Sequence, residues 1–182
     1  MDPTILAYIA GFLDGDGSIF FQITRRKDYV FGYQLRCNLA FYQKSDHQEI
    51  LVWLKGCLKA GYMRHRKTGV SDYTIVDPAE VKRILLMLQP YVRLKKEHVA
   101  LSLTILERLP ICKTAQEFLK LCYEVDRFQT LNYSKKRTNT ASVVESHLKA
   151  NHFLTPVETS SYKEESGSEK GAAKTPISSL AK

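Results

Sequence analysis

The sequence predicts an α+β protein, because the spacing of apolar residues changes from a helical period to a strand period and back. Helical spacing covers residues 2–14, 45–60, 78–88, 95–109 and 114–131, whereas residues 18–42 and 62–76 alternate apolar and polar side chains. Each alternating region is interrupted by a turn, so each is predicted to be an antiparallel hairpin. The predicted order is α-β-β-α-β-β-α, followed by two or three further helices.

Signals for helix ends support this division. Asp2-Pro3 and Asp77-Pro78 each place an aspartate at the N-cap and a proline at the first helical position. Ser45-x-x-Gln48 and Thr114-x-x-Glu117 both match the capping box, which predicts a helix starting at each. We expect the second helix to end at Gly61, and the first to end at about residue 13 or 14.

The first hairpin has an apolar inward face and a polar outward face. The predicted inward residues are Ile19, Phe21, Ile23, Tyr33, Leu35, Cys37, Leu39 and Phe41. The polar residues on the outward face of the two hairpins are Gln22, Thr24, Arg26, Gln34, Arg36, Asn38, Arg64, Arg66, Asp72 and Thr74. An ordinary solvated sheet face is also polar, but it mixes Lys and Glu, whereas this face has a single acid. Arg, Asn and Gln are the side chains that hydrogen-bond base edges in the major groove, which accommodates a two-stranded ribbon.

Composition indicates a basic single-domain protein. The chain has 182 residues, a formal net charge of +8 and an isoelectric point of about 9.3. This surplus points to a polyanionic partner, with nucleic acid as the first candidate. We expect one domain over residues 1–154 and a disordered tail over 155–182, which is rich in Ser, Glu, Lys and Gly.

The four cysteines form no C-x-x-C pair, so we expect reduced and mostly buried thiols in an intracellular protein. No apolar run reaches the roughly 18 residues that a membrane span requires, and we expect no membrane partner. The N-terminus resembles neither a signal peptide nor a transit peptide. Either the protein stays where it is translated, and we expect an organelle (mitochondrion or chloroplast), or its targeting signal is not visible in the sequence.

The stretch at residues 9–17, Ile-Ala-Gly-Phe-Leu-Asp-Gly-Asp-Gly, joins the first helix to the first strand. Ala7, Gly11 and Gly15 recur every four residues and form one smooth stripe on the helix. A glycine inside a helix costs roughly 0.5–1 kcal/mol relative to alanine, and close approach of a second helix would offset that cost. We therefore predict a homodimer interface comprising Ala7, Ala10, Gly11, Asp14 and Gly15.

Asp14 and Asp16 end this helix, where the macrodipole is negative and a carboxylate is unfavourable unless a cation is near. Packing of the stripe on a two-fold axis would bring two Asp16 carboxylates together, and Mg²⁺ would relieve their repulsion. We expect Asp16 alone on the metal, with Asp14 bracing the turn. The alternative is that both residues only cap the helix.

Two later clusters are basic. Arg93, Lys95 and Lys96 follow a proline, and a second cluster contains Lys135, Lys136, Arg137 and Thr138. Each alone is typical of a solvated surface. Beside a base-reading face, they become candidate contacts to phosphates, which position a duplex without reading it.

Residues 9–17 resemble the signature of the LAGLIDADG homing endonucleases. The resemblance extends over about residues 4–150 to the single-motif branch of that family. The further segments that carry it are Gln43-Lys44, Gly61-Tyr62-x-Arg64-x-Arg66, Val70-Ser71-Asp72-Tyr73, Leu88-Gln89-Pro90-Tyr91 and Leu94-Lys95.

This resemblance implies one four-stranded, saddle-shaped antiparallel sheet per subunit of a homodimer. It also implies that Asp16 and the Gly15 carbonyl bind a divalent metal, and that Gln43 lies near the nucleophilic water. Lys95 matches the catalytic-site lysine of the family. Where relatives often have an arginine, this chain has His47, so the water-positioning part of the site departs from the family pattern.

The activity that the resemblance implies is Mg²⁺-dependent hydrolysis of both strands of a long, pseudo-palindromic DNA site. Three alternatives stay open at the level of sequence. One is an RNA maturase that assists folding of intron RNA, and a second is a DNA-binding regulator without cleavage activity. The third is a basic α+β protein in which the glycine-rich helix has only a packing role.

Overall fold

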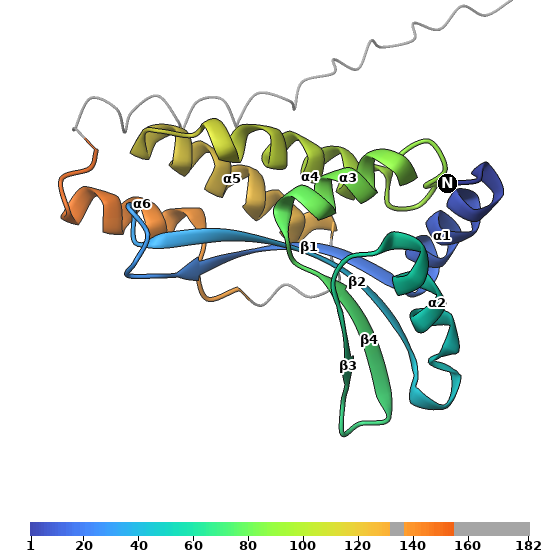
Figure 1. Cartoon of the computed structure of the whole chain (residues 1–182). Coiled ribbons are helices and arrows are strands. Elements are labelled where there is room, and N and C mark those ends of the chain that lie inside the picture. The colour runs from blue at the N-terminus through green and yellow to red at the C-terminus, as the bar shows by residue number, and fades with distance from the viewer. Residues whose placement is uncertain (132–136, 155–182) are drawn as a thin grey trace, which may run out of the picture.

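The computed structural model describes residues 1–131 and 137–154, and it confirms the predicted α+β order (Figure 1). The core elements are α1 (Pro3–Asp16), β1 (Gly17–Arg25), β2 (Tyr33–Lys44), α2 (Glu49–Leu58), β3 (Tyr62–His65), β4 (Val70–Ile75) and α3 (Pro78–Leu88). The helices that follow are α4 (Lys96–Arg108), α5 (Ala115–Leu131) and α6 (Ala141–Ala150), and short 3₁₀ turns cover Ser45–His47 and Leu109–Ile111.

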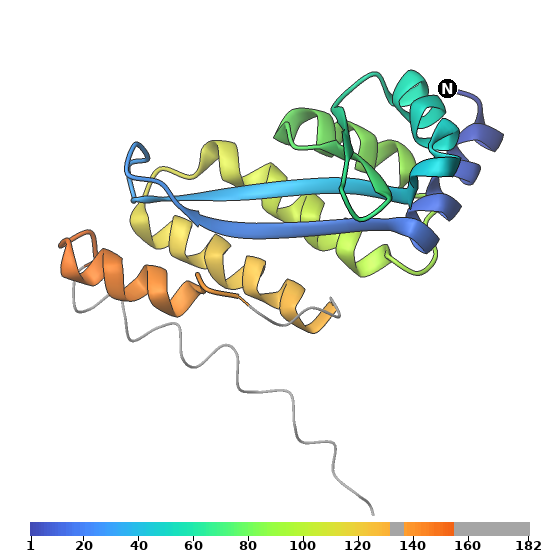
Figure 2. The same ribbon diagram turned by 90° about the horizontal axis from the view of Figure 1, so that it is seen from below.

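The four strands form one antiparallel sheet in the order β1-β2-β4-β3. The sheet is strongly curved, and β3 and β4 turn away from the long ribbon made by β1 and β2 (Figure 1). Helices α3, α4 and α5 cover one face (Figures 1 and 2). Seen from below, the strands lie in front of these helices, so the helices leave the opposite, concave face of the sheet uncovered (Figure 2).

The core lies between the sheet and the helices that cover it. All eight residues predicted to face inward from the first hairpin are buried. Phe21 of β1 packs on Phe128 of α5 with ring centroids 5.3 Å apart, and Phe41 stacks on Tyr73 of β4 at 5.9 Å. Because the strands place alternate residues on opposite faces, burying this set directs the polar set to the concave face.

Helix α1 is longer than predicted and ends at Asp16, with the Gly17 N–H donating to the Leu13 carbonyl. The next residue has to be glycine, because a Cβ at position 17 would lie 2.6 Å from Leu13 Cδ1 and 2.7 Å from the Leu13 backbone. With glycine at this position, α1 is followed directly by β1 without a loop. The result is that Asp16 stands at the junction itself.

The predicted helix caps are confirmed at three of four positions. Asp2 and Asp77 accept hydrogen bonds from backbone N–H groups at their helix starts, and Thr114 and Glu117 form the reciprocal capping box. The capping box at Ser45 is wrong. Residues 45–47 form a 3₁₀ turn and α2 begins only at Glu49, because the Ser45 hydroxyl pairs with that of Ser71, 3.0 Å away.

All four cysteines are free; Cys37 and Cys122 are buried, whereas Cys57 and Cys112 are partly exposed. Burial raises the pKa of the Cys37 and Cys122 thiols well above the ordinary value. None of the helices described by the structure combines the length and the apolar character that crossing a bilayer requires. The tail predicted over 155–182 lies outside the described residues.

Candidate active site and nucleic-acid interface

The residues predicted to take part in chemistry gather at one end of the β1–β2 ribbon. Asp16 is exposed at the end of α1, directly before Gly17, which pairs with Phe41. Gln43 is two residues beyond Phe41 on β2, so the register places it level with the end of α1. His47 is exposed at the end of the 3₁₀ turn that follows β2. Helix, strand and turn therefore converge on the same edge.

Asp14 holds the segment before α4 against the end of α1. Its carboxylate accepts hydrogen bonds from the backbone N–H of Arg93 (2.6 Å) and of Lys95 (3.0 Å). Lys95 Nζ in turn donates to the Asp14 backbone carbonyl at 2.5 Å. Burial opposes ionisation of Asp14, but the backbone N–H donors outweigh it and hold its pKa below the usual value. Asp14 thus braces the turn that carries Lys95.

Lys95 is half-buried and lies within electrostatic reach of both acids of the motif. Burial lowers the pKa of its ammonium group, and the charges of Asp14 and Asp16 oppose that shift. Gln43 turns its Oε1 to the Lys44 backbone N–H at 2.9 Å. One chain therefore supplies a carboxylate, an ammonium group and an amide around the end of α1.

The oxygen atoms at this end suit a hard divalent cation. Within residues 1–131 and 137–154, no three His, Cys, Asp or Glu side chains form a group that could hold a metal ion. The candidate oxygens are the exposed Asp16 carboxylate and the backbone carbonyl of Gly15, since the Leu13 and Asp14 carbonyls already accept hydrogen bonds. Carboxylate and carbonyl oxygens are the ligands that Mg²⁺ and Ca²⁺ prefer. They make part of a coordination sphere, and Mg²⁺ usually takes its remaining ligands from water molecules and substrate phosphate oxygens.

The small-residue stripe of α1 is open to the outside. Ala7, Gly11 and Gly15 are exposed, and a Cβ added at either glycine would meet no atom within 4 Å. Ala10 differs from the prediction: it is fully buried inside the same chain, so it is not available to a partner. Ala10 is buried because it lies on the side of α1 that faces the core, together with Ile9 and Leu13.

Most of the predicted base-reading residues are accessible on the concave face, and three are not. The accessible or partly accessible set comprises Gln22, Thr24, Arg26, Gln34, Arg36, Arg64 and Arg66. Asn38, Asp72 and Thr74 are buried beneath their neighbours. For Asp72 the reason is that Arg64, Arg66 and Thr74 all donate hydrogen bonds to its carboxylate. Asn38 Nδ2 has no hydrogen-bond partner among the described residues.

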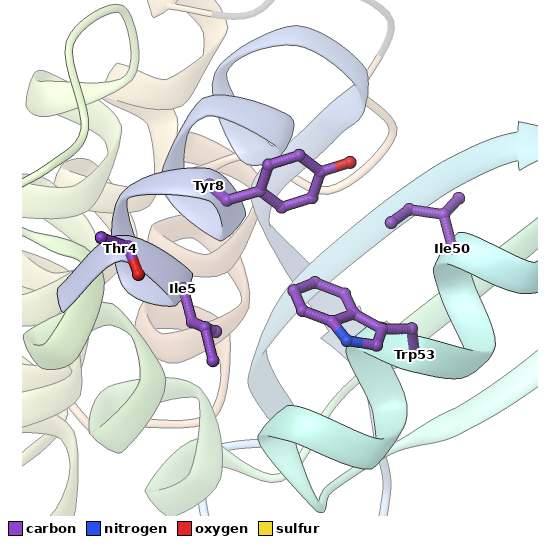
Figure 3. A pocket seen from close by; sticks show the side chains of 5 residues that line it. All are labelled: Thr4, Ile5, Tyr8, Ile50 and Trp53. Carbon is purple, nitrogen blue, oxygen red and sulfur yellow. The ribbon is translucent and has the colours of Figure 1, made fainter. Parts of the chain in front are cut away.

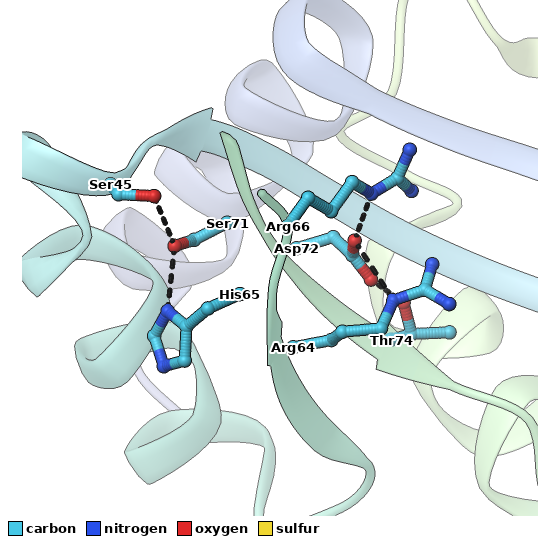
Figure 4. A network of polar contacts seen from close by, with 7 residues as sticks. All are labelled: Ser45, Arg64, His65, Arg66, Ser71, Asp72 and Thr74. Atoms are coloured by element: carbon cyan, nitrogen blue, oxygen red, sulfur yellow. Dashed lines mark hydrogen bonds and ion pairs between the residues drawn. The ribbon is translucent and has the colours of Figure 1, made fainter. Parts of the chain in front are cut away.

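Asp72 anchors two arginines on this face (Figure 4). Its carboxylate accepts hydrogen bonds from Arg66 Nε (2.6 Å), Arg64 Nε (3.3 Å) and Thr74 Oγ1 (3.0 Å). Burial opposes its ionisation, but the donors from Arg66, Thr74 and Arg64 prevail and lower the pKa of Asp72. The Arg66 guanidinium also lies 5.5 Å from the centroid of the Tyr42 ring. Sequence reasoning placed Asp72 among base contacts; the single acid in a basic face was the signal for this anchoring role.

One member of the second basic cluster, Arg137, has partners inside the chain, which the sequence did not predict. Arg137 is largely buried, donates to the Val125 carbonyl at 2.9 Å and lies 3.6 Å from Asp126, so it ties the chain to α5. Thr138 is exposed. Lys135 and Lys136 lie outside the described residues. The sequence showed the charge but not the internal partners of Arg137.

Helix α1 ending at an acidic junction, and a curved sheet with a polar concave face, together define a known class of protein. The family model described as LAGLIDADG endonuclease matches residues 9–106, and the chain belongs to this family. The DNA endonuclease I-CreI of Chlamydomonas reinhardtii is 39% identical over 140 residues, covering 76% of this chain and 85% of that protein. The DNA endonuclease I-CvuI of Chlorella vulgaris is 34% identical over 148 residues, covering 81% and 92%.

A solved structure of I-CvuI shares the fold with a TM-score of 0.80 at 32% identity, covering 84% of this chain and 97% of that one. That crystal contains the I-CreI target DNA, uncleaved, with 2 mM Mg. A second I-CvuI structure, with its own target and 2 mM Ca, matches with the same TM-score of 0.80.

Proposed function

We propose that this chain is a site-specific homing endonuclease that cuts both strands of double-stranded DNA with a divalent cation. The observation that carries the proposal is that hydrogen bonds to Asp14 hold Lys95 at the end of α1 that carries Asp16, beside a concave face of arginines and amides. The relatives named as DNA endonucleases supply the reaction class. Mg²⁺ is the cation we propose, because the oxygen ligands at the end of α1 suit it.

The working unit we propose is a homodimer, because each chain has one Asp16 and the small-residue stripe of α1 is exposed with open space above its glycines. The open stripe of α1 continues into an apolar groove of about 420 Å³ lined by Thr4, Ile5, Tyr8, Ile50 and Trp53 (Figure 3). Tyr8 and Trp53 are 54% and 39% exposed, and their rings meet edge to face at 5.5 Å. A second copy on this surface would cover these rings and bring the second Asp16 to the centre.

In this arrangement Asp16 and the Gly15 carbonyl would hold the cation next to the scissile phosphate. A bound divalent cation lowers the pKa of a water molecule and stabilises charge on the phosphate. Lys95, held in place by Asp14, offers an ammonium group to the negative charge that develops on the phosphate oxygens. The Gln43 amide and the His47 ring would hydrogen-bond and orient water at the same edge. Gln43 and His47 would therefore position the water, whereas Lys95 and the cation held by Asp16 would stabilise negative charge.

Recognition is assigned to the concave face. Arg64 and Arg66, which Asp72 anchors, would donate to guanine, and the amides of Gln22 and Gln34 would pair with adenine. The β1 strand of nine residues is about 30 Å long at roughly 3.3 Å per residue. Each subunit would therefore read about nine base pairs at 3.4 Å per step, so a dimer would read a long, pseudo-palindromic site.

The test is a cleavage selection from a randomised or genomic DNA library with Mg²⁺, followed by Asp16→Asn on the site obtained. We expect double-strand cleavage that requires the divalent cation, and loss of cleavage in Asp16→Asn with DNA binding retained. Glu107→Gln, which removes an exposed carboxylate of α4, is the matched control and should cleave as the wild type. Undiminished cleavage by Asp16→Asn would exclude the metal role. Binding of DNA without cleavage, whichever divalent cation is present, would favour a DNA-binding regulator. Selective binding of intron RNA would favour an RNA maturase.

A further inference from the structure

The end of the β1–β2 ribbon far from Asp16 has little support from the sheet. Strand β2 pairs with β4 only over Leu39–Lys44, so the part over residues 33–38 pairs with β1 alone. A two-stranded hairpin by itself is marginally stable in water. The turn over residues 26–32, which closes this ribbon, exposes Arg26, Tyr29 and Val30. Contacts from outside the sheet therefore have to hold this turn in position.

Aromatic contacts from the C-terminal part of the chain meet the turn. Phe31 packs between Phe118 of α5, with ring centroids 5.2 Å apart, and Phe153, which follows α6, at 5.8 Å. Tyr33 meets the His147 ring of α6 edge to face at 5.2 Å. Figure 1 shows α6 at the turn end of the ribbon, opposite the end that carries α1.

The backbone of the turn lies close to the His147 side chain of α6 at Gly32. Gly32 has φ of +72°, and a Cβ at this position would lie 2.7 Å from His147 Nε2. The Gly32 N–H donates to the Tyr29 carbonyl at 2.8 Å, and the Gly32 carbonyl accepts from the Arg26 N–H at 2.8 Å. The residue that closes the turn therefore lies against the His147 side chain of α6.

Two further interactions attach the same C-terminal segment to the ribbon and fix Phe153. Asn139 Nδ2 donates to the Ile23 carbonyl of the edge strand β1 at 2.9 Å. The Phe153 N–H donates to the Leu148 carbonyl at 2.9 Å, and His152 adopts a left-handed φ of +59° to turn the chain back. This backbone turn directs the Phe153 ring to Phe31 instead of continuing along α6.

We propose that His147 and Phe153 are positioning residues for DNA recognition, holding the ribbon turn at the outermost base pairs of the site. The inference rests on the proposed function, since it assigns the turn to reading DNA. The turn lies about 30 Å, or roughly nine base pairs, from Asp16 at the spacings of a strand and of a duplex. Its position therefore governs outer recognition and leaves the chemistry at Asp16 untouched.

The experiment compares Phe153→Ala and His147→Ala with the wild type on a panel of targets carrying single base-pair changes at every position. A mismatch at a recognised base pair lowers affinity by about 5-fold to 150-fold. In the alanine variants we expect this discrimination to fall at least about threefold at the outermost positions and to stay unchanged near the centre. The single-turnover cleavage rate on the full site at saturating enzyme should not change. Phe153→Leu should restore discrimination, because it refills the contact with Phe31.

Val143→Ala, which removes an exposed apolar side chain of the same helix outside these contacts, is the matched control. An equal loss of affinity at every position, or an unchanged profile in both alanine variants, would overturn the proposal. Hydrogen–deuterium exchange of the free protein tests, without DNA, whether Phe153 holds the ribbon turn in place. The Tyr29 and Gly32 backbone amides should exchange at least about threefold faster in Phe153→Ala than in the wild type. Unchanged exchange in Phe153→Ala would refute the role of Phe153 in holding the turn. A wild-type protein that binds its DNA site without cleaving it would refute only the proposed endonuclease activity.

Discussion

Replacing Asp72 by asparagine tests whether a buried carboxylate organises the concave face. The change preserves shape but removes the charge that faces Arg66 Nε at 2.6 Å and Arg64 Nε at 3.3 Å. It also places an amide NH₂ near two donors. We expect both arginines to leave their present positions, because a neutral amide oxygen holds a guanidinium group less strongly than a carboxylate.

The cost of this change follows from the exposure of the partners. Asp72 is fully buried, whereas Arg64 and Arg66 are 57% and 42% exposed. Hydrogen bonds to charged groups contribute about 1.5–3 kcal/mol each when their loss leaves the partner unsatisfied. Here both guanidinium groups can return to water, so we expect the free energy of unfolding to fall by only about 1–3 kcal/mol in total. A loss of about 2 kcal/mol lowers the melting temperature of a chain this size by roughly 4–8 °C.

The pH dependence of this effect has a definite sign. The pKa of Asp72 is depressed in the folded state, so its contribution to stability is present above the unfolded pKa of about 3.9. It is lost as the pH falls through the lower, folded pKa. The difference in unfolding free energy between wild type and Asp72→Asn should therefore be constant near neutrality and shrink below about pH 4.

The assay is denaturant unfolding from pH 3 to 7, together with base preference at each position of the cleaved site. Asp28→Asn is the matched control, because Asp28 forms a similar pair with Arg26 at 2.7 Å in which both side chains are exposed. That variant should lose less than about 1 kcal/mol. If Asp72→Asn is as stable as the control and keeps the wild-type base preference, Asp72 does not position the arginines and the reasoning fails.

Three further variants address other parts of the molecule. Gly11→Leu should abolish dimer formation in sedimentation, whereas Gly56→Leu, at an exposed glycine of α2 with equal space, should leave the dimer intact; equal behaviour of the two would refute the interface. Asp14→Asn should cut the cleavage rate with little effect on DNA affinity, because it loosens the turn that holds Lys95, and its destabilisation should vanish as the pH falls below about 4; an unchanged rate would contradict that role. Arg64→Ala should cost about 1–3 kcal/mol in binding and relax preference at one base pair, and a uniform loss across sequences would instead identify a phosphate contact.

Local patterns predicted most elements of this fold. The alternation over residues 18–42 predicted which residues are buried, because a strand that covers a core on one face has to place apolar side chains at every second position. Asp2 and Asp77 predicted two helix starts, because capping depends only on neighbouring backbone groups. The capping box at Ser45 failed for a nonlocal reason: Ser71, 26 residues away, competes for the same hydroxyl.

In the candidate site, too, some features follow from the local sequence and others only from the tertiary structure. The sequence by itself determined that Asp16 stands at the end of a helix with a small-residue stripe, since both follow from spacing along one helix. It also determined a basic, amide-rich strand face. Only the tertiary structure decided that Asp14 holds Lys95, that Asp72 holds two arginines, and that Arg137 is tied to α5 instead of free. These pairings join residues distant in sequence or facing across strands, and composition does not specify which charged group finds which partner. That choice is made by the register of the sheet and the packing of the helices on it.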